Sequence, residues 1–197
     1  MEGEAITYYL KLIAMSIGTE YLQTVIRRVK YYKELGDKTF EQLNSDAEFH
    51  YQPNEESNSI AVIIQHMTGN MLSRWTNFLT EDGEKEWRQR DDEFTVHHYT
   101  KTQLLEIWEK GWRCFLGALE SLQEEDLLKT IHIRQEKLSA IDAINRQLAH
   151  YPYHIGQIVY LGRMVRDQEW KNLSIPKGHS QQYNTGQDIK DPAKKFK

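Results

Sequence analysis

Proline is the residue that most constrains this sequence, because the 197 residues contain only four of them. Proline kinks or ends a helix, so long stretches without it can stay helical over many turns. In four stretches, three of them free of proline, apolar residues recur three and four positions apart, which is the helical period. The pattern predicts four helices, over roughly residues 17–43, 59–80, 100–122 and 140–166.

Four helices of about twenty residues or more in so short a chain indicate an all-α fold, a four-helix bundle. Residues 130–134 alternate polar and apolar side chains, which predicts a short β-hairpin within residues 128–139. We expect an N-terminal extension over residues 1–14, a four-helix domain over 15–173 and a polar C-terminal tail over 174–197.

Some helix boundaries are marked by capping residues. Thr100 with Gln103 is a plausible capping box for the third helix, and Ser139 with Asp142 can cap the fourth. Gly36 is a possible break in the first helix.

The composition is that of an ordinary globular protein, with 39% hydrophobic and 27% charged residues, and predicts one domain with a full core. A net charge of −4 argues against a dedicated nucleic-acid-binding protein. The single cysteine, Cys114, cannot form an internal disulfide, which is typical of a reducing compartment. Because no apolar run is long enough to span a bilayer and the first residues are acidic, we expect no membrane span, no secretory signal and a cytoplasmic location.

The sharpest local feature is a pair of histidines, His150 and His154, four residues apart in the fourth predicted helix. At this spacing two side chains lie on one helix face, and two imidazoles can reach one metal ion. The pair alone is a weak motif. Pro152 lies between them and either kinks the helix or ends it. We favour a kink, because the apolar period resumes at Ile155 and Ile158.

Each of two predicted helices carries a polar stripe that includes histidine and adjoins an apolar face. Together the two stripes can bring three imidazoles together next to the core. Neutral imidazoles suit zinc, nickel, iron or copper, and three protein ligands leave a position open for substrate. The alternative is that these histidines are hydrogen-bonded core residues without a metal. The stripes consist of Arg146, His150, His154 and Gln157 in one helix, and Ser59, His66, Asn70, Ser73 and Asn77 in the other.

Other site motifs are missing. No histidine follows a glutamate at the spacing that di-iron carboxylate bundles use. There is no His-Glu-x-x-His, no phosphate-binding glycine loop and no Cys-x-x-Cys. His97 and His98, beside Glu93 in the charged segment 81–99, are expected to be solvated, and His132 is expected to face outward.

Several motifs together resemble the DinB/YfiT-like family. Residues 148–158, Leu-Ala-His-Tyr-Pro-Tyr-His-Ile-Gly-Gln-Ile, resemble its fourth-helix signature, and residues 64–70, Ile-Gln-His-Met-Thr-Gly-Asn, resemble its second-helix histidine motif. Residues 52–60 and 174–178 are similar to a branch of unknown function. The resemblance covers roughly residues 15–186.

This resemblance implies a four-helix bundle in which three histidines hold a divalent metal ion, and these map onto His66, His150 and His154. It also implies a homodimer. Characterised relatives include metal-dependent transferases and isomerases that use low-molecular-weight thiols such as bacillithiol, mycothiol or glutathione. Others are described only as damage-inducible proteins or as candidate metal hydrolases. We expect zinc, nickel, iron or manganese in the site.

Two functions follow from the resemblance. The first is a metal-dependent enzyme, a thiol S-transferase or a hydrolase; the second is a non-catalytic metal-binding or stress-response protein. In the enzyme, Asn70 and Gln157 would orient substrate or, as we prefer, hydrogen-bond to the histidines. Arg74, Arg146 and Arg163 would bind an anionic substrate or be ordinary surface charges. A binding protein could have the open metal face closed by aromatic side chains such as Tyr151, Tyr153 or Trp75.

Overall fold

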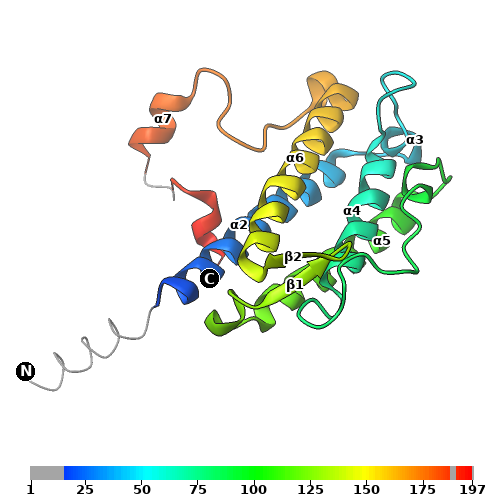
Figure 1. The fold of residues 1–197 in the computed structure, drawn as a ribbon. Helices are drawn as coiled ribbons and strands as arrows, with labels where there is room; N and C mark the ends of the chain where they lie inside the picture. The colour runs from blue at the N-terminus through cyan, green and yellow to red at the C-terminus, as the bar shows by residue number, and fades with distance from the viewer. Residues whose placement is uncertain (1–15, 187–189, 197) are drawn as a thin grey trace, which may run out of the picture.

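Four long helices dominate the computed structural model, which describes residues 16–186 and 190–196 (Figure 1). The predicted all-α bundle with a short hairpin is confirmed. The long helices are α2 (Ile17–Gln42), α4 (Ile60–Trp75), α5 (Lys101–Ser121) and α6 (Ala140–Arg166). The hairpin consists of β1 (Thr130–Ile133) and β2 (Glu136–Ser139), and short α3 (Asp46–Phe49) follows α2.

Each long helix begins at a hydroxyl side chain that accepts a hydrogen bond from a backbone N–H of the first turn. The four capping residues are Ser16, Ser59, Thr100 and Ser139. The predicted capping box of Thr100 is present in full.

Helix α4 ends five residues earlier than predicted, at Trp75 instead of residue 80. The reason is Asn77, which adopts the left-handed conformation with φ of 50°, a conformation that asparagine tolerates better than most residues. Asn77 therefore lies beyond the helix and outside the polar stripe predicted for it. Gly36, predicted as a possible break, lies inside a continuous α2, where a Cβ atom would be 2.6 Å from the Trp108 ring.

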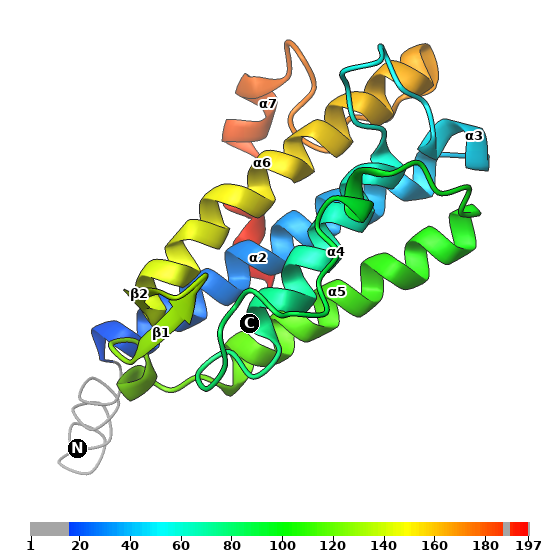
Figure 2. The same cartoon turned by 45° about the vertical axis from the view of Figure 1, so that its right-hand side comes forward.

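The helices pack most extensively in two pairs, α4 with α5 and α2 with α6 (Figure 2). Helix α4 also packs against α6, which sets the two histidine-bearing helices side by side. The largest buried side chains in the core include Trp108, Trp112, Phe115, Tyr151 and Phe40. Helix α6 continues past Pro152 to Arg166, so the proline does not end it.

The long segment between α4 and α5 is tied to the hairpin rather than fully solvated. The carboxylate of Asp82 accepts hydrogen bonds from the backbone N–H groups of Arg134 and Gln135 in the hairpin turn. In the same segment Arg88 and Glu93 are buried. Of the two histidines expected to be solvated beside Glu93, His98 is exposed and His97 is half-buried.

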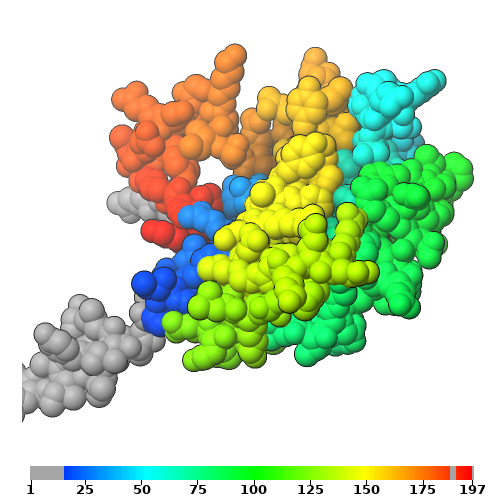
Figure 3. All heavy atoms as spheres, viewed as in Figure 1, coloured from blue at the N-terminus to red at the C-terminus, as the bar shows by residue number. Residues whose placement is uncertain are grey.

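The C-terminal segment returns to α2. Asp191 accepts two hydrogen bonds from Arg28, each 2.6 Å long. Ala193, in the short turn η4 (Pro192–Lys195), is buried. Figure 3 shows this segment, in red, beside the blue residues of α2. The domain division stays a prediction, and the extension at 1–14 falls outside the described residues.

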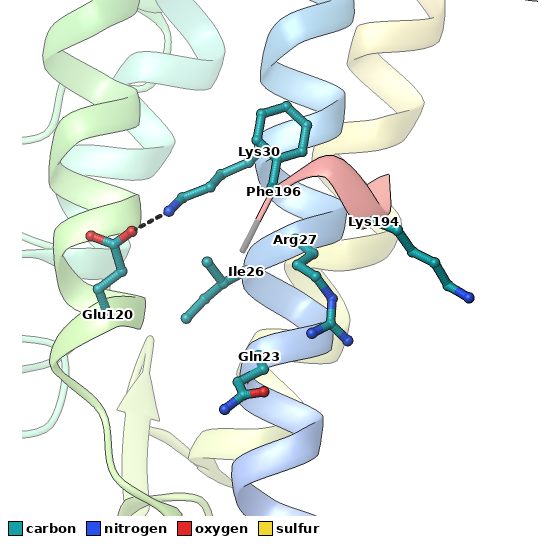
Figure 4. A pocket seen from close by; sticks show the side chains of 7 residues that line it. All are labelled: Gln23, Ile26, Arg27, Lys30, Glu120, Lys194 and Phe196. Atoms are coloured by element: carbon teal, nitrogen blue, oxygen red, sulfur yellow. Dashed lines mark ion pairs between the residues drawn. The ribbon is translucent and has the colours of Figure 1, made fainter. Parts of the chain in front are cut away.

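A cavity of about 680 Å³ is an open groove between α2, α5 and the C-terminal turn (Figure 4). It is lined mainly by long polar side chains, and an ion pair of 2.7 Å joins Lys30 to Glu120 across it. None of its lining residues is a histidine or a cysteine. Across the described residues, no helix has the length and apolar character needed to cross a bilayer.

Candidate metal centre

Three histidine side chains from two helices converge between α4 and α6. His66 comes from the middle of α4, and His150 and His154 come from successive turns of α6. The Nε2 atom of His150 lies 3.0 Å from Nε2 of His154 and 3.5 Å from Nε2 of His66. The three potential ligand atoms lie within 4.8 Å of one another, an arrangement suited to one metal ion. His66 and His154 are 6% and 9% exposed, and His150 is half-buried.

The second nitrogen of each imidazole faces an oxygen atom. Nδ1 of His66 lies 3.0 Å from Oε2 of Glu93. Nδ1 of His150 lies 3.2 Å from Oε1 of Gln147, and Nδ1 of His154 lies 2.8 Å from Oε1 of Gln157. Carboxylate and amide oxygens accept hydrogen bonds, so each Nδ1 carries the proton. Each Nε2 then presents a lone pair toward the other two. Lone pairs this close repel one another unless a cation lies between them, so the donor set fits a metal ion.

Burial keeps the two histidines of α6 in the neutral form that binds metal. The pKa of His150 is lowered from 6.5 to about 3, first by burial and then by the neighbouring His154 and His66 and the charges of Arg146 and Arg88. Burial likewise lowers the pKa of His154, although its hydrogen bond with Gln157 opposes the change. At neutral pH neither ring needs to lose a proton before it coordinates a metal.

The low pKa of His150 predicts how the metal-free protein responds to acid. His150 has an ordinary pKa of 6.5 in the unfolded chain and a pKa of about 3 in the folded one. At pH values between these two, the unfolded chain binds a proton at His150 that the folded chain does not. Stability is therefore retained above this range and lost as the pH falls through it. We expect the urea midpoint of metal-free protein to fall between about pH 7 and pH 5, and to fall less in a His150→Gln variant. An equal fall of the urea midpoint in both proteins would show that His150 is not the cause of the acid sensitivity.

Glu93 is one contact of the histidine cluster that the sequence analysis missed. It lies in the short turn η1 (Asp92–Phe94), and its carboxylate also accepts hydrogen bonds from Arg88 Nε and Nη2, at 2.7 and 2.9 Å. Burial alone would raise the pKa of Glu93, but the hydrogen bonds from His66 and Arg88 and the charge of Arg88 hold it below its ordinary value. Glu93 is therefore an ionised group that orients His66 and adds negative charge behind it.

Gly69, one turn along α4 from His66, is the sequence signal that points to this contact. An isolated glycine inside a helix is less favourable than alanine by about 1 kcal/mol, a cost that a packing role can offset. Here a Cβ atom on Gly69 would lie 2.1 Å from Oε1 of Glu93. The glycine leaves the space in which the carboxylate reaches His66.

The other predicted polar residues divide into those at the centre and those away from it. Gln157 contacts His154, whereas Asn70 makes no hydrogen bond to a histidine among the described residues and accepts one of 2.9 Å from Tyr151 Oη. Gln147, which was not singled out from the sequence, lies three residues before His150 and contacts it, as Gln157, three residues after His154, contacts His154. Ser73 donates a hydrogen bond to the Gly83 carbonyl oxygen instead.

The remaining histidines do not join the cluster. His132 is exposed, as predicted, and His97 is paired with Asp92 at 3.3 Å, outside the three-histidine group. His50 contacts the Tyr99 carbonyl oxygen at 2.7 Å, and His179 is exposed.

A cavity of about 240 Å³ lies beside His66 and His150. It gives a small molecule access to the histidines from one side. Asn70 and Gln147 line it, as do five arginines: Arg74, Arg88, Arg90, Arg134 and Arg146. Arg163, the third arginine considered from the sequence, is exposed and does not line this cavity.

The comparisons with known proteins place the chain in a family without assigning an activity. A family model described as "Protein of unknown function (DUF1572)" matches residues 16–179. No curated protein matches the chain. No solved structure matches it either.

Proposed function

The chain belongs to the family described as Protein of unknown function (DUF1572), and we propose that it is a DinB/YfiT-like, divalent-metal-dependent enzyme that transfers a low-molecular-weight thiol to an electrophile. One observation carries the proposal. Three Nε2 atoms converge beside a cavity while every Nδ1 faces an oxygen acceptor. This arrangement supports a cation site with an accessible side.

His66, His150 and His154 would hold the ion, with zinc, nickel, iron or manganese as candidates. When bound, a divalent ion held only by neutral ligands keeps its full charge, attracts anions and favours the thiolate form of a thiol. Glu93, Gln147 and Gln157 hold the Nδ1 protons and thereby fix which nitrogen of each ring faces the ion.

The protein's own sulfur is poorly placed to be the nucleophile, which favours a thiol cosubstrate. Cys114 lies in α5, with its Sγ atom 3.6 Å from Thr76 Oγ1 and 3.9 Å from the Met71 carbonyl oxygen. It does not line the cavity beside the histidines. The sulfur in the proposed reaction therefore comes from a small molecule.

Access to the histidines favours an enzyme over a protein that only stores metal. The three aromatic residues that could have closed the site do not line the cavity. Tyr151 is buried, and its hydroxyl bonds to Asn70 and Trp75, while Tyr153 is largely exposed. A cavity beside the histidines is what a substrate requires. The homodimer and the cytoplasmic location that the sequence suggested stay predictions.

The test is thiol conjugation by protein loaded separately with zinc, nickel, iron or manganese. Glutathione, bacillithiol and mycothiol would each be offered with 1-chloro-2,4-dinitrobenzene. We expect conjugation with at least one metal and thiol, loss of this activity in His154→Ala, and retention in Cys114→Ser.

Two other results would overturn the transferase proposal. Hydrolysis of p-nitrophenyl acetate that depends on His154, without thiol conjugation, would favour a metal-dependent hydrolase. Stoichiometric metal with neither reaction would favour the non-catalytic metal-binding protein.

A further inference from the structure

The cavity beside His66 and His150 is lined by positive charge from separate parts of the chain. Its arginines come from α4, from the segment between α4 and α5, from the hairpin turn and from α6. The lining contains five guanidinium groups and no carboxylate. Carboxylates outside the lining pair with Arg74, Arg88 and Arg134. An anion that enters the cavity would therefore meet mainly the charges of Arg90 and Arg146.

Two of these arginines are buried and keep donors unused. Arg74 is 4% exposed, and its Nε has no hydrogen-bond partner among the described residues. Nη1 of Arg88, likewise buried, lies 3.6 Å from Oε1 of Glu84 but makes no hydrogen bond within the described part of the chain. A buried donor without an acceptor is destabilising by about 1–3 kcal/mol. A ligand that supplies oxygen acceptors would remove this cost.

The surrounding carboxylates do not satisfy the remaining donors. Glu84 pairs with Arg74 at 2.9 Å and with Arg134 at 3.0 Å, and Glu93 is held by Arg88. Within the described ranges, Arg146 is in no ion pair. Its exposed side chain is therefore available to a ligand.

Asn70 adds a neutral donor to the same cavity. Its Oδ1 atom accepts the hydrogen bond from Tyr151, so its amide nitrogen is left as the free donor. No partner of this nitrogen is found in the part of the chain that the structure describes. The lining is thus rich in donors and matches a ligand rich in acceptors.

We propose that this arginine-lined cavity binds the anionic end, carboxylate or phosphate, of a small substrate and holds it beside His66 and His150. This inference rests on the proposed function for the role of the histidines, but the anion site itself does not require the metal. The volume corresponds to about eight water molecules, which suits a small anion rather than a polymer.

The test is isothermal titration of the parent protein with succinate and, separately, with inorganic phosphate, at constant ionic strength. Titration of metal-loaded and metal-free protein separates arginine binding from metal binding. We expect binding in both forms, weakened about tenfold in Arg146→Met and in Arg90→Met, since one charge-assisted hydrogen bond accounts for about that factor. Arg163→Met, an exposed arginine of the same helix as Arg146, should bind as the parent does.

The two proposals fail in different ways. If the protein holds no metal but still binds the anion through Arg146 and Arg90, the proposed function fails and the anion site stands. If the anion binds only to metal-loaded protein, or with equal affinity to both cavity variants and the parent, the arginines do not form the site and this inference is overturned. Tighter binding of succinate assigns a dicarboxylate, and tighter binding of phosphate assigns a phosphate ester.

Discussion

Protein purified without a polyhistidine tag or a chelator is expected to contain close to one divalent ion per chain, and a His150→Ala/His154→Ala variant only background metal. The variant keeps a single imidazole of the three that converge. Loss of a residue that merely supports a metal ligand weakens binding about 10- to 100-fold, so loss of two ligands should weaken it further. Elemental analysis of both proteins measures the difference.

The matched control replaces two histidines that are exposed and outside the cluster, His132→Ala/His179→Ala, and should keep the metal. Circular dichroism must show that all three proteins are folded. Background metal in the parent, even after incubation with zinc, nickel, iron or manganese, would contradict a metal site here. The histidines would then be core residues whose convergence serves the bundle.

The helices were predictable because their signals are local. A continuous apolar period and a hydroxyl cap define each helix within a few residues, as the capping box at Thr100 illustrates. The pairing of His150 with His154 was equally local, since helical geometry alone puts them on one face. The approach of His66 to this pair is not a local feature, because it depends on the packing of α4 against α6.

What the sequence did not reveal depends on contacts between distant segments. Glu93 lies in a charged stretch whose composition is typical of solvated loops, and its burial follows from the folding of that stretch against α4. The return of the C-terminal segment rests on the pairing of Arg28 with Asp191, 163 residues apart. Neither contact has a period or a spacing that a single sequence can display.

Glu93→Gln is expected to weaken metal binding about 10- to 100-fold, the usual effect of removing a residue that orients a histidine ligand. Glutamine keeps the shape of the side chain, but it lacks the negative charge that holds the His66 proton and pairs with Arg88. The variant also leaves Arg88 buried without this partner, which should lower the free energy of unfolding by roughly 3 kcal/mol. A competing chromophoric chelator would measure affinity, and urea unfolding would measure stability.

The Gly69→Ala variant tests the position of the Glu93 carboxylate separately from its negative charge. The new methyl group would lie 2.1 Å from Oε1 of Glu93, which is too close, so the carboxylate must shift from its present position while its charge is kept. Gly156→Ala is the matched control, because it makes the same change in α6 where no atom lies within 4 Å. We expect Gly69→Ala to lose metal affinity as Glu93→Gln does, and Gly156→Ala to retain it. Parental affinity in both Gly69→Ala and Glu93→Gln would show that Glu93 serves only to neutralise Arg88, and that His66 is oriented by the packing of α4 alone.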